Sequence, residues 1–172
     1  ARALEFFDNE SLNFLREKYP NIPVAAVAAI FFEQETRTET EESILNAWLA
    51  LLDQYHAFAD SWFATNEQDQ ARLREFRHQL PVLMNEWFAR YRQRKVSTDM
   101  SVPDDAFAGL FQLYQETLRT SGLRYTIFGH IGDNRLGLRK LRGNGVGRSA
   151  AAGGQRQCFA FLGGAPHHSG AH

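Results

Sequence analysis

Short apolar runs and stretches of helical periodicity follow one another along the N-terminal part of the chain. Leu4 to Phe7 is an apolar run closed by Asp8, which predicts a strand followed by a helix cap. Apolar residues then recur at helical spacing as far as Tyr19, and Pro20 to Pro23 end that helix. Val24 to Phe32 is continuously apolar, with β-branched and aromatic members, which favours a buried central strand over a helix.

Two amphipathic helices are predicted next, with a short strand candidate at 61–65 between them. Thr38 to Glu41 has the form of a capping box and opens the first helix, and Thr65 to Gln68 repeats this form at the start of the second. Pro81 is expected to break or restart the second helix, because proline lacks the backbone N–H that a helix interior requires. The apolar stripe of this helix consists of Leu73, Phe76 and Leu80.

The pattern continues with a strand, a helix and a last strand. Val96 to Val102 alternates loosely, as in a strand, and Asp104 begins a helix that Gly122 closes. The apolar run Tyr125 to Phe128 then leads into Gly129-His130. Strands and helices thus alternate from a first strand to a fifth. This order predicts an α+β domain of ferredoxin-like type, with a mostly antiparallel sheet and helices on one face.

The composition changes abruptly after Asn134. Nine of the 13 glycines fall from Gly137 onward, and no Asp or Glu follows Asp133, whereas six Arg or Lys residues do. Such a segment, without apolar periodicity, is typical of a disordered basic tail. Because the composition changes abruptly at the tip of a predicted strand, a second hypothesis is that the sequence after Asn134 is out of frame relative to its ancestor. We therefore predict a domain at 1–136, as a fragment of a longer protein, and a Gly/Arg/Ala-rich tail at 137–172, disordered or aberrant.

Length, composition and charge favour a globular protein and argue against several other classes. A chain of 172 residues with 44% hydrophobic residues can form one globular domain with a real core. The formal net charge of -1 argues against a nucleic-acid protein that relies on overall charge. No apolar run approaches the roughly 20 residues that span a bilayer, and the N-terminus lacks a secretory signal. Cys158 is the only cysteine, which excludes an internal disulfide and favours a cytoplasmic protein, with a membrane-peripheral location left open.

Candidate chemistry gathers at the tip of the last predicted strand, residues 127–134. Two glycines bracket the segment His130-Ile131, and glycine lets a backbone turn sharply or approach a ligand closely. Asp133 and Asn134 follow directly. A strand that stops here delivers polar side chains at its tip, which makes His130 a candidate pocket residue. The alternative is a strand-end histidine whose ring is satisfied by backbone groups.

Three segments, supported by Leu4 to Asp8, carry a resemblance to a known family. In this order and spacing they resemble the C-terminal domain of the FAD-linked oxidases of the vanillyl-alcohol oxidase superfamily, and within it the D-lactate dehydrogenase and glycolate oxidase group. The resemblance covers Ala3 to about Leu136. The three segments are Leu73 to Pro81, Lys95 to Pro103 and Phe128 to Asn134.

The resemblance implies a division of labour between two domains. A separate N-terminal domain would bind FAD, and the domain present here would cover the isoalloxazine and shape the pocket for a small 2-hydroxy acid, which is oxidised by hydride transfer to the flavin. His130 would act as the base, and Asn134 would contact the flavin. Arg77, together with Lys95, would bind the substrate carboxylate, which suits a bidentate donor. Solvent-exposed surface positions are the alternatives for Arg77 and Lys95.

In the metal-using branch of this group, a second histidine and a later glutamate join the first histidine in binding a divalent ion, which suits a 2-hydroxy acid. His130 matches the first histidine, but Gly137 stands where the second is expected, and the glutamate-bearing segment and the FAD domain are missing. The resemblance therefore implies an incomplete metal site and a fragment that is inactive alone. The rival hypothesis is a non-catalytic binding or dimerisation module.

Overall fold

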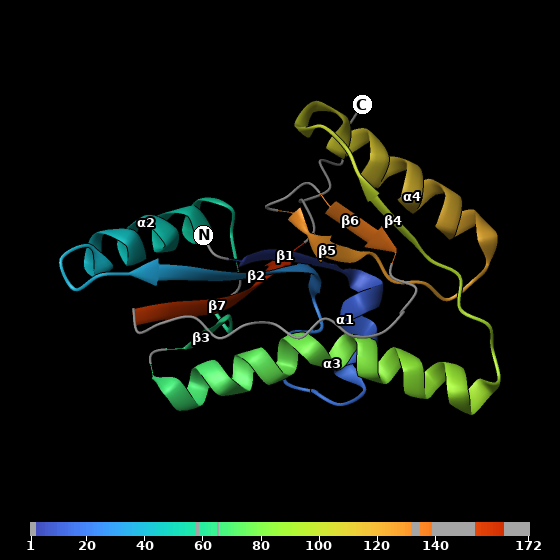
Figure 1. The fold of residues 1–172 in the computed structure, drawn as a ribbon, viewed down its shortest axis with the longest axis horizontal. Helices are drawn as coiled ribbons and strands as arrows, with labels where there is room; N and C mark the ends of the chain where they lie inside the picture. The colour runs from blue at the N-terminus through green and yellow to red at the C-terminus, as the bar shows by residue number, and fades with distance from the viewer. Residues whose placement is uncertain (1–2, 58, 65, 132–134, 139–153, 164–172) are drawn as a thin grey trace, which may run out of the picture.

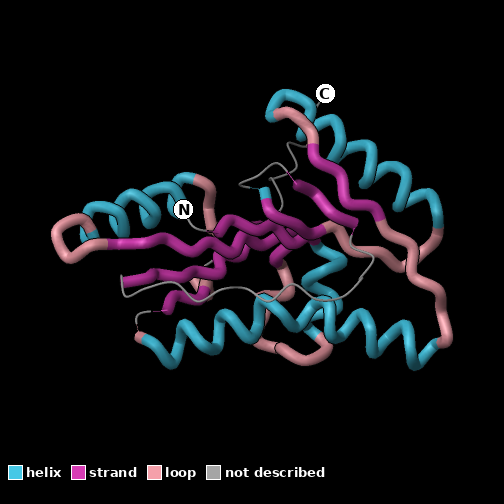
Figure 2. Tube along the Cα trace, in the orientation of Figure 1, coloured by secondary structure: helices cyan, strands magenta, loops and turns pink. Residues whose placement is uncertain are grey.

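The computed structural model describes residues 3–57, 59–64, 66–131, 135–138 and 154–163, with the backbone alone at 135–138 and 154–157. Seven strands form one antiparallel sheet in the order β3-β7-β2-β1-β5-β6-β4, and helices lie against it (Figures 1 and 2). The strands are β1 (Ala3–Asp8), β2 (Ala26–Thr36), β3 (Trp62–Ala64), β4 (Thr98–Ser101), β5 (Phe128–His130), β6 (Arg135–Leu138) and β7 (Gly154–Gly163). The helices are α1 (Asn9–Arg16), α2 (Glu41–Gln54), α3 (Glu67–Tyr91), the 3₁₀ turn η1 (Asp104–Ala106) and α4 (Phe107–Ser121).

The predicted α+β class with an antiparallel sheet is confirmed, and the order of elements from β1 to β5 is the one that the hydrophobic pattern predicts. Asp8 caps α1 by accepting a hydrogen bond from the backbone N–H of Ser11 at 2.8 Å. Gly122 ends α4 with a φ of +67°, a conformation that favours glycine. In the described residues, no helix is both long and apolar enough to cross a membrane.

Helices cover both faces of the sheet, whereas one face was expected. In Figure 1, α3 lies below the sheet and α2 and α4 lie above it. The reason is the continuous apolar character of the central strands: Phe31 packs in the core beneath α1 and α3, and its neighbour Phe32 stacks on Trp48 of α2 at 3.9 Å. A strand that is apolar on both sides must be covered on both sides.

The last described strand lies inside the sheet. β7 pairs with β2 over ten registered positions, from Ala26–Gly163 to Thr36–Gly154, and with β3 on its other edge. A disordered tail at 137–172 would contribute no residues to the core. This prediction is wrong for the end of β7, where four residues are buried: Cys158, Phe159, Ala160 and Phe161. The physical reason is a short apolar run, 158–162, whose alternate side chains serve the two faces and whose signal is hidden by the Gly- and Arg-rich sequence around it.

Helix starts and the effect of proline differ in detail from the predictions. Asn66, not Thr65, caps α3, by accepting from the backbone N–H of Asp69 at 2.9 Å. The capping box at 38–41 is not formed, since α2 begins at Glu41 and the N-cap residue Thr40 makes no side-chain capping bond. The predicted break at Pro81 is wrong: α3 continues through it. Buried neighbours on both sides, Leu80 and Met84, hold the helix on the core.

Candidate functional site

Three ionisable side chains meet where α3 crosses the β1–β5 pair. Glu5 of β1 lies opposite His130 of β5 in the antiparallel register, so the two side chains share one face of the sheet. Arg77 comes from the middle of α3, directly after the buried Phe76 of the apolar stripe. The sheet register and the helix packing thus bring together residues from the beginning, middle and end of the domain.

Glu5 is the common partner of the other two. Its Oε1 accepts hydrogen bonds from Nε of Arg77 at 2.8 Å and from Nη2 of the same guanidinium. Nδ1 of His130 lies 3.0 Å from the same oxygen. The guanidinium of Arg77 also lies over the ring of Phe31, 5.2 Å from its centroid. These contacts hold the arginine on the sheet rather than in solvent.

The charge of Glu5 is set by two opposing effects. Burial, which leaves only 8% of the residue exposed, raises its pKa, whereas the hydrogen bonds from His130 and Arg77 and the charge of Arg77 lower it. The lowering effects prevail, and the pKa of Glu5 lies below its ordinary value of 4.5. Glu5 is therefore an ionised, buried carboxylate at neutral pH.

A cavity of about 170 Å³ opens beside this cluster. His130 is 44% exposed in its side chain and Arg77 is 22% exposed, so both can reach a ligand there. The size suits a small organic acid and is well below that of a typical pocket for a drug-sized molecule. The cavity is lined by Glu5, Phe7, Arg77, His78, Pro81, Phe128, Gly129 and His130.

The structure brings together two of the four residues that the sequence singled out. Arg77 and His130 line the same cavity, and both contact Glu5. Lys95 does not line it; its Nζ donates to Oδ1 of Asn85 at 3.3 Å and lies 5.9 Å from the ring centroid of Phe88. Asn134 lies outside the described residues. The roles expected for all four stay predictions.

Glu5 was missed by the sequence analysis. The signal was present, because Glu5 is the one charged residue inside the apolar run 4–7, and a charged residue at a buried strand position requires a partner. The helical position of Arg77 gave no indication that its partner lies on β1. Only the register of β1 with β5, together with the placement of α3, reveals the cluster.

The described residues do not fit a divalent metal. Among them, no group of three or more His, Cys, Asp or Glu side chains gathers at one point. Gly137, at the position expected for a second histidine, belongs to β6 and pairs with Asp99 and Phe128. Nδ1 of His130 faces Glu5, and the third member of the cluster is the cation Arg77. No chemical step is therefore derived through a metal.

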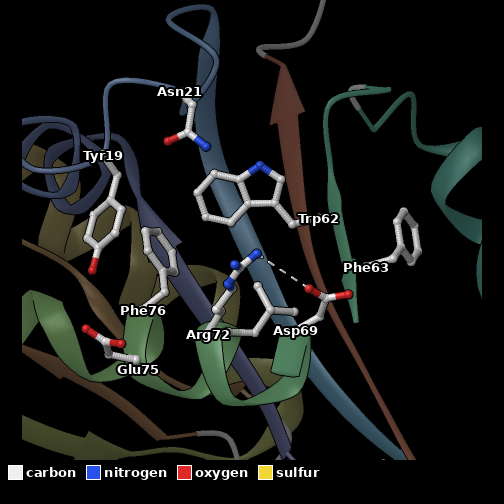
Figure 3. Close-up of a pocket in the computed structure, with 9 residues that line it drawn as sticks. Tyr19, Asn21, Trp62, Phe63, Asp69, Arg72, Glu75 and Phe76 are labelled. Atoms are coloured by element: carbon white, nitrogen blue, oxygen red, sulfur yellow. Dashed lines mark ion pairs between the residues drawn. The ribbon is translucent and has the colours of Figure 1, made fainter. Parts of the chain in front are cut away.

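A larger hollow, of about 370 Å³, lies near the start of α3 (Figure 3). Phe76 lies between Tyr19 and Trp62, with ring centroids 4.7 and 4.8 Å away. The hollow also contains an ion pair, Arg72 with Asp69, whose atoms are 3.8 Å apart; 71% of the Arg72 side chain and 34% of the Asp69 side chain are exposed. None of the residues that the sequence singled out for chemistry lines this hollow, so we place the candidate site at Glu5, Arg77 and His130.

Comparison with known proteins gives one match. The family model described as "FAD linked oxidases, C-terminal domain" matches residues 1–145, which is most of the chain. No curated protein and no solved structure matches the chain.

Proposed function

The chain belongs to the family of the FAD-linked oxidases, whose C-terminal domain it matches, and we propose that it forms the substrate and cap domain of an FAD-dependent 2-hydroxy-acid dehydrogenase of the D-lactate or glycolate type. One observation carries this proposal: the carboxylate of Glu5 holds an arginine and a histidine at the same small cavity. A 2-hydroxy acid offers a carboxylate to the first and a neighbouring hydroxyl to the second.

Arg77 supplies the binding step. Its Nε and Nη2 are used by Glu5, and no described residue makes a hydrogen bond to Nη1. Nη1 can therefore donate to the substrate carboxylate, with a charge-assisted hydrogen bond that is stronger than a neutral one. Binding through this end would bring the hydroxyl-bearing carbon of the acid towards His130.

His130 supplies the proton step. Its Nδ1 faces Glu5, so Nε2 is the ring nitrogen left to accept the hydroxyl proton of the substrate. As this O–H bond breaks, the C–H bond at the same carbon gives up its electron pair as a hydride, and a C=O bond forms, so that the product is a 2-oxo acid. FAD, when bound, supplies the hydride acceptor. The ionised Glu5 stabilises the imidazolium that results.

The cavity helps to define how the cofactor would be held. About 170 Å³ accommodates a small acid but not a dinucleotide. FAD would therefore be held mainly by an N-terminal FAD-binding domain, with this domain contributing the substrate side of the site.

The test uses the chain co-expressed with an FAD-binding domain of the family. The assembled protein should reduce a dye with D-lactate or glycolate, and His130→Ala should lower kcat by about 100-fold to 10,000-fold with the flavin content unchanged. Arg74→Ala, an exposed position one turn before His78 on α3, is the matched control and should keep full turnover. Unchanged turnover of His130→Ala would remove the histidine from the mechanism. A failure of the two domains to associate would favour the non-catalytic module.

A further inference from the structure

We infer that Glu5 is the positioning residue of this site: it acts through its two neighbours, fixing the tautomer of His130 and the plane of Arg77 at once. The inference rests on the proposed function for its consequence in turnover, although its structural content can be tested without activity. Three donor atoms, from a strand and a helix, converge on one oxygen of a carboxylate that is 8% exposed.

The first effect of Glu5 is on the imidazole. A carboxylate paired with a guanidinium only accepts hydrogen bonds, so the ring nitrogen that faces it at 3.0 Å must carry a hydrogen. Neutral His130 is therefore held as the tautomer protonated on Nδ1, and the lone pair of Nε2 is free to take a proton. Without the carboxylate, the neutral ring would divide between two tautomers, of which one presents a hydrogen to the substrate hydroxyl instead of a lone pair.

The second effect is on the guanidinium. Glu5 engages Nε and Nη2, which fixes the edge of the group that faces the sheet, and the ring of Phe31 supports its plane from 5.2 Å. Phe31 and His130 are the register partners of Glu5 on β2 and β5. The arginine thus lies over a row of three side chains on three adjacent strands. Sheet geometry, rather than a loop, sets the direction of Nη1.

The third effect concerns charge. With substrate bound and His130 neutral, the two carboxylates outnumber the one guanidinium, so the cluster carries one net negative charge. Transfer of the hydroxyl proton to His130 and of the hydride to the flavin leaves two carboxylates beside two cations, and the cluster becomes neutral. Proton acceptance is thereby favoured in a partly buried site, where an unbalanced charge is costly. This balance requires that Glu5 be ionised and in place.

The first measurement is ¹⁵N NMR of the ring nitrogens of His130, in the chain as it stands and at a pH where titration shows the ring to be neutral. The signal is assigned by its loss in His130→Asn. We expect a protonated Nδ1 and an unprotonated Nε2 in the wild type, and a mixture of tautomers in Glu5→Gln. Protonation at Nε2 in the wild type, or an unchanged tautomer in Glu5→Gln, would overturn the inference.

The second measurement is turnover in the assembled enzyme. Glu5→Gln should lower kcat by about 100-fold or more, whereas Glu33→Gln, at a carboxylate of similar burial on β2 outside the cavity lining, should leave it unchanged. Glu5→Asp keeps the charge but withdraws the oxygen by roughly 1.5 Å, and it guards against a Glu5→Gln variant that does not fold. If Glu5 acts through the position of its oxygen, Glu5→Asp is also impaired; full activity of Glu5→Asp would overturn the inference. A fixed tautomer in a wild type that turns over no 2-hydroxy acid would support the positioning and overturn the proposed function.

Discussion

Glu5 and Asp8 lie three residues apart on β1 and are buried to the same degree, 8% and 6% exposed, yet their pKa values move in opposite directions. Strand alternation places them on opposite faces of the sheet. Glu5 meets Arg77 and His130, which bring its pKa below the ordinary value. The carboxylate of Asp8 is held by neutral donors, among them the backbone N–H and the hydroxyl of Ser11 at 2.8 and 2.5 Å and the backbone of Ile127, and burial raises its pKa to about 6.

The difference shows what a cation adds to a buried carboxylate. Both residues lose their hydration on folding, and both gain hydrogen bonds. Hydrogen bonds from neutral groups, as at Asp8, reduce the penalty of burial without removing it, whereas at Glu5 the hydrogen bond from His130 and the guanidinium of Arg77 together outweigh it. At the site of proposed chemistry, the buried negative charge of Glu5 is paired with a cation. At the cap of α1, the carboxylate of Asp8 is buried without a cation.

The largest effect on stability is expected when Glu5 loses its cation and becomes, like Asp8, a buried carboxylate without one. Arg77→Ala leaves a buried carboxylate with His130 as its remaining partner, and we expect the free energy of unfolding at pH 7 to fall by on the order of 3 kcal/mol. The wild-type contribution of Glu5 is present above its unfolded pKa of 4.5 and is lost as the pH falls through its lower folded pKa. The loss caused by Arg77→Ala should therefore shrink towards pH 4. Urea unfolding at both pH values measures it.

The double variant Glu5→Gln/Arg77→Ala is the control for this prediction. It removes the charge together with its partner, so it should be more stable at pH 7 than Arg77→Ala alone. If the double variant were as unstable as the single one, the cost would lie in the packing of Arg77 on Phe31 rather than in the charge of Glu5.

A smaller effect, of opposite sign, is expected at the other end of the strand. The folded pKa of Asp8, about 6, exceeds its ordinary value of 3.8, so its ionisation lowers stability as the pH rises from about 4 to 6. Asp8→Asn keeps a good N-cap residue and removes this penalty. The difference between a folded pKa of about 6 and the ordinary 3.8 corresponds to about 3 kcal/mol, offset by about 1 kcal/mol for a weaker bond with Ser11, so we expect a gain of about 2 kcal/mol at pH 7. Thermal unfolding at pH 4 and 7 measures it, and an equal change at both values would contradict the assignment.

The smallest effect is expected from an ion pair on the same helix that lacks burial. Arg72 and Asp69, in the hollow of Figure 3, are 3.8 Å apart, and the Arg72 side chain is exposed. Arg72→Ala should change the free energy of unfolding by less than about 1 kcal/mol, and added salt should reduce even that. Urea unfolding at low and high salt tests this expectation. A loss comparable with that of Arg77→Ala would show that burial is not what separates the two arginines.

Much of the fold followed from local pattern, and the exceptions have identifiable causes. The strand at 24–32, the stripe of α3 and the cap at Asp8 all depend on residues close in sequence. Coverage of both faces was overlooked, although the unbroken apolar run of β2 requires it. The continuation of α3 through Pro81 depends on the long-range packing of Leu80 and Met84, which outweighs a local preference. β7 was not predicted, because its apolar run is short and lies in a segment rich in Gly and Arg.

The candidate site was only half predictable from the sequence. His130 stood out through its glycine neighbours, and Arg77 through the family resemblance. What joins them, Glu5, could not be found from spacing, because the partners lie 72 residues apart on α3 and across a strand pair on β5. Lys95 closes the basic run Arg90-Tyr91-Arg92-Gln93-Arg94-Lys95 at the end of α3, and this sequence neighbourhood contains no signal that distinguishes a pocket residue from a surface one.

The place of β7 in the sheet has a consequence for how the protein emerges from the ribosome. β2 is synthesised early, but the strand that pairs with its free edge is the last one described, and their contacts span more than a hundred residues. Until that strand arrives, β2 offers a long apolar edge with unpaired N–H and C=O groups, and β3 has no neighbour. Such an edge invites pairing with other nascent chains. The edge of β2 is therefore expected to stay unpaired until the chain has passed residue 163.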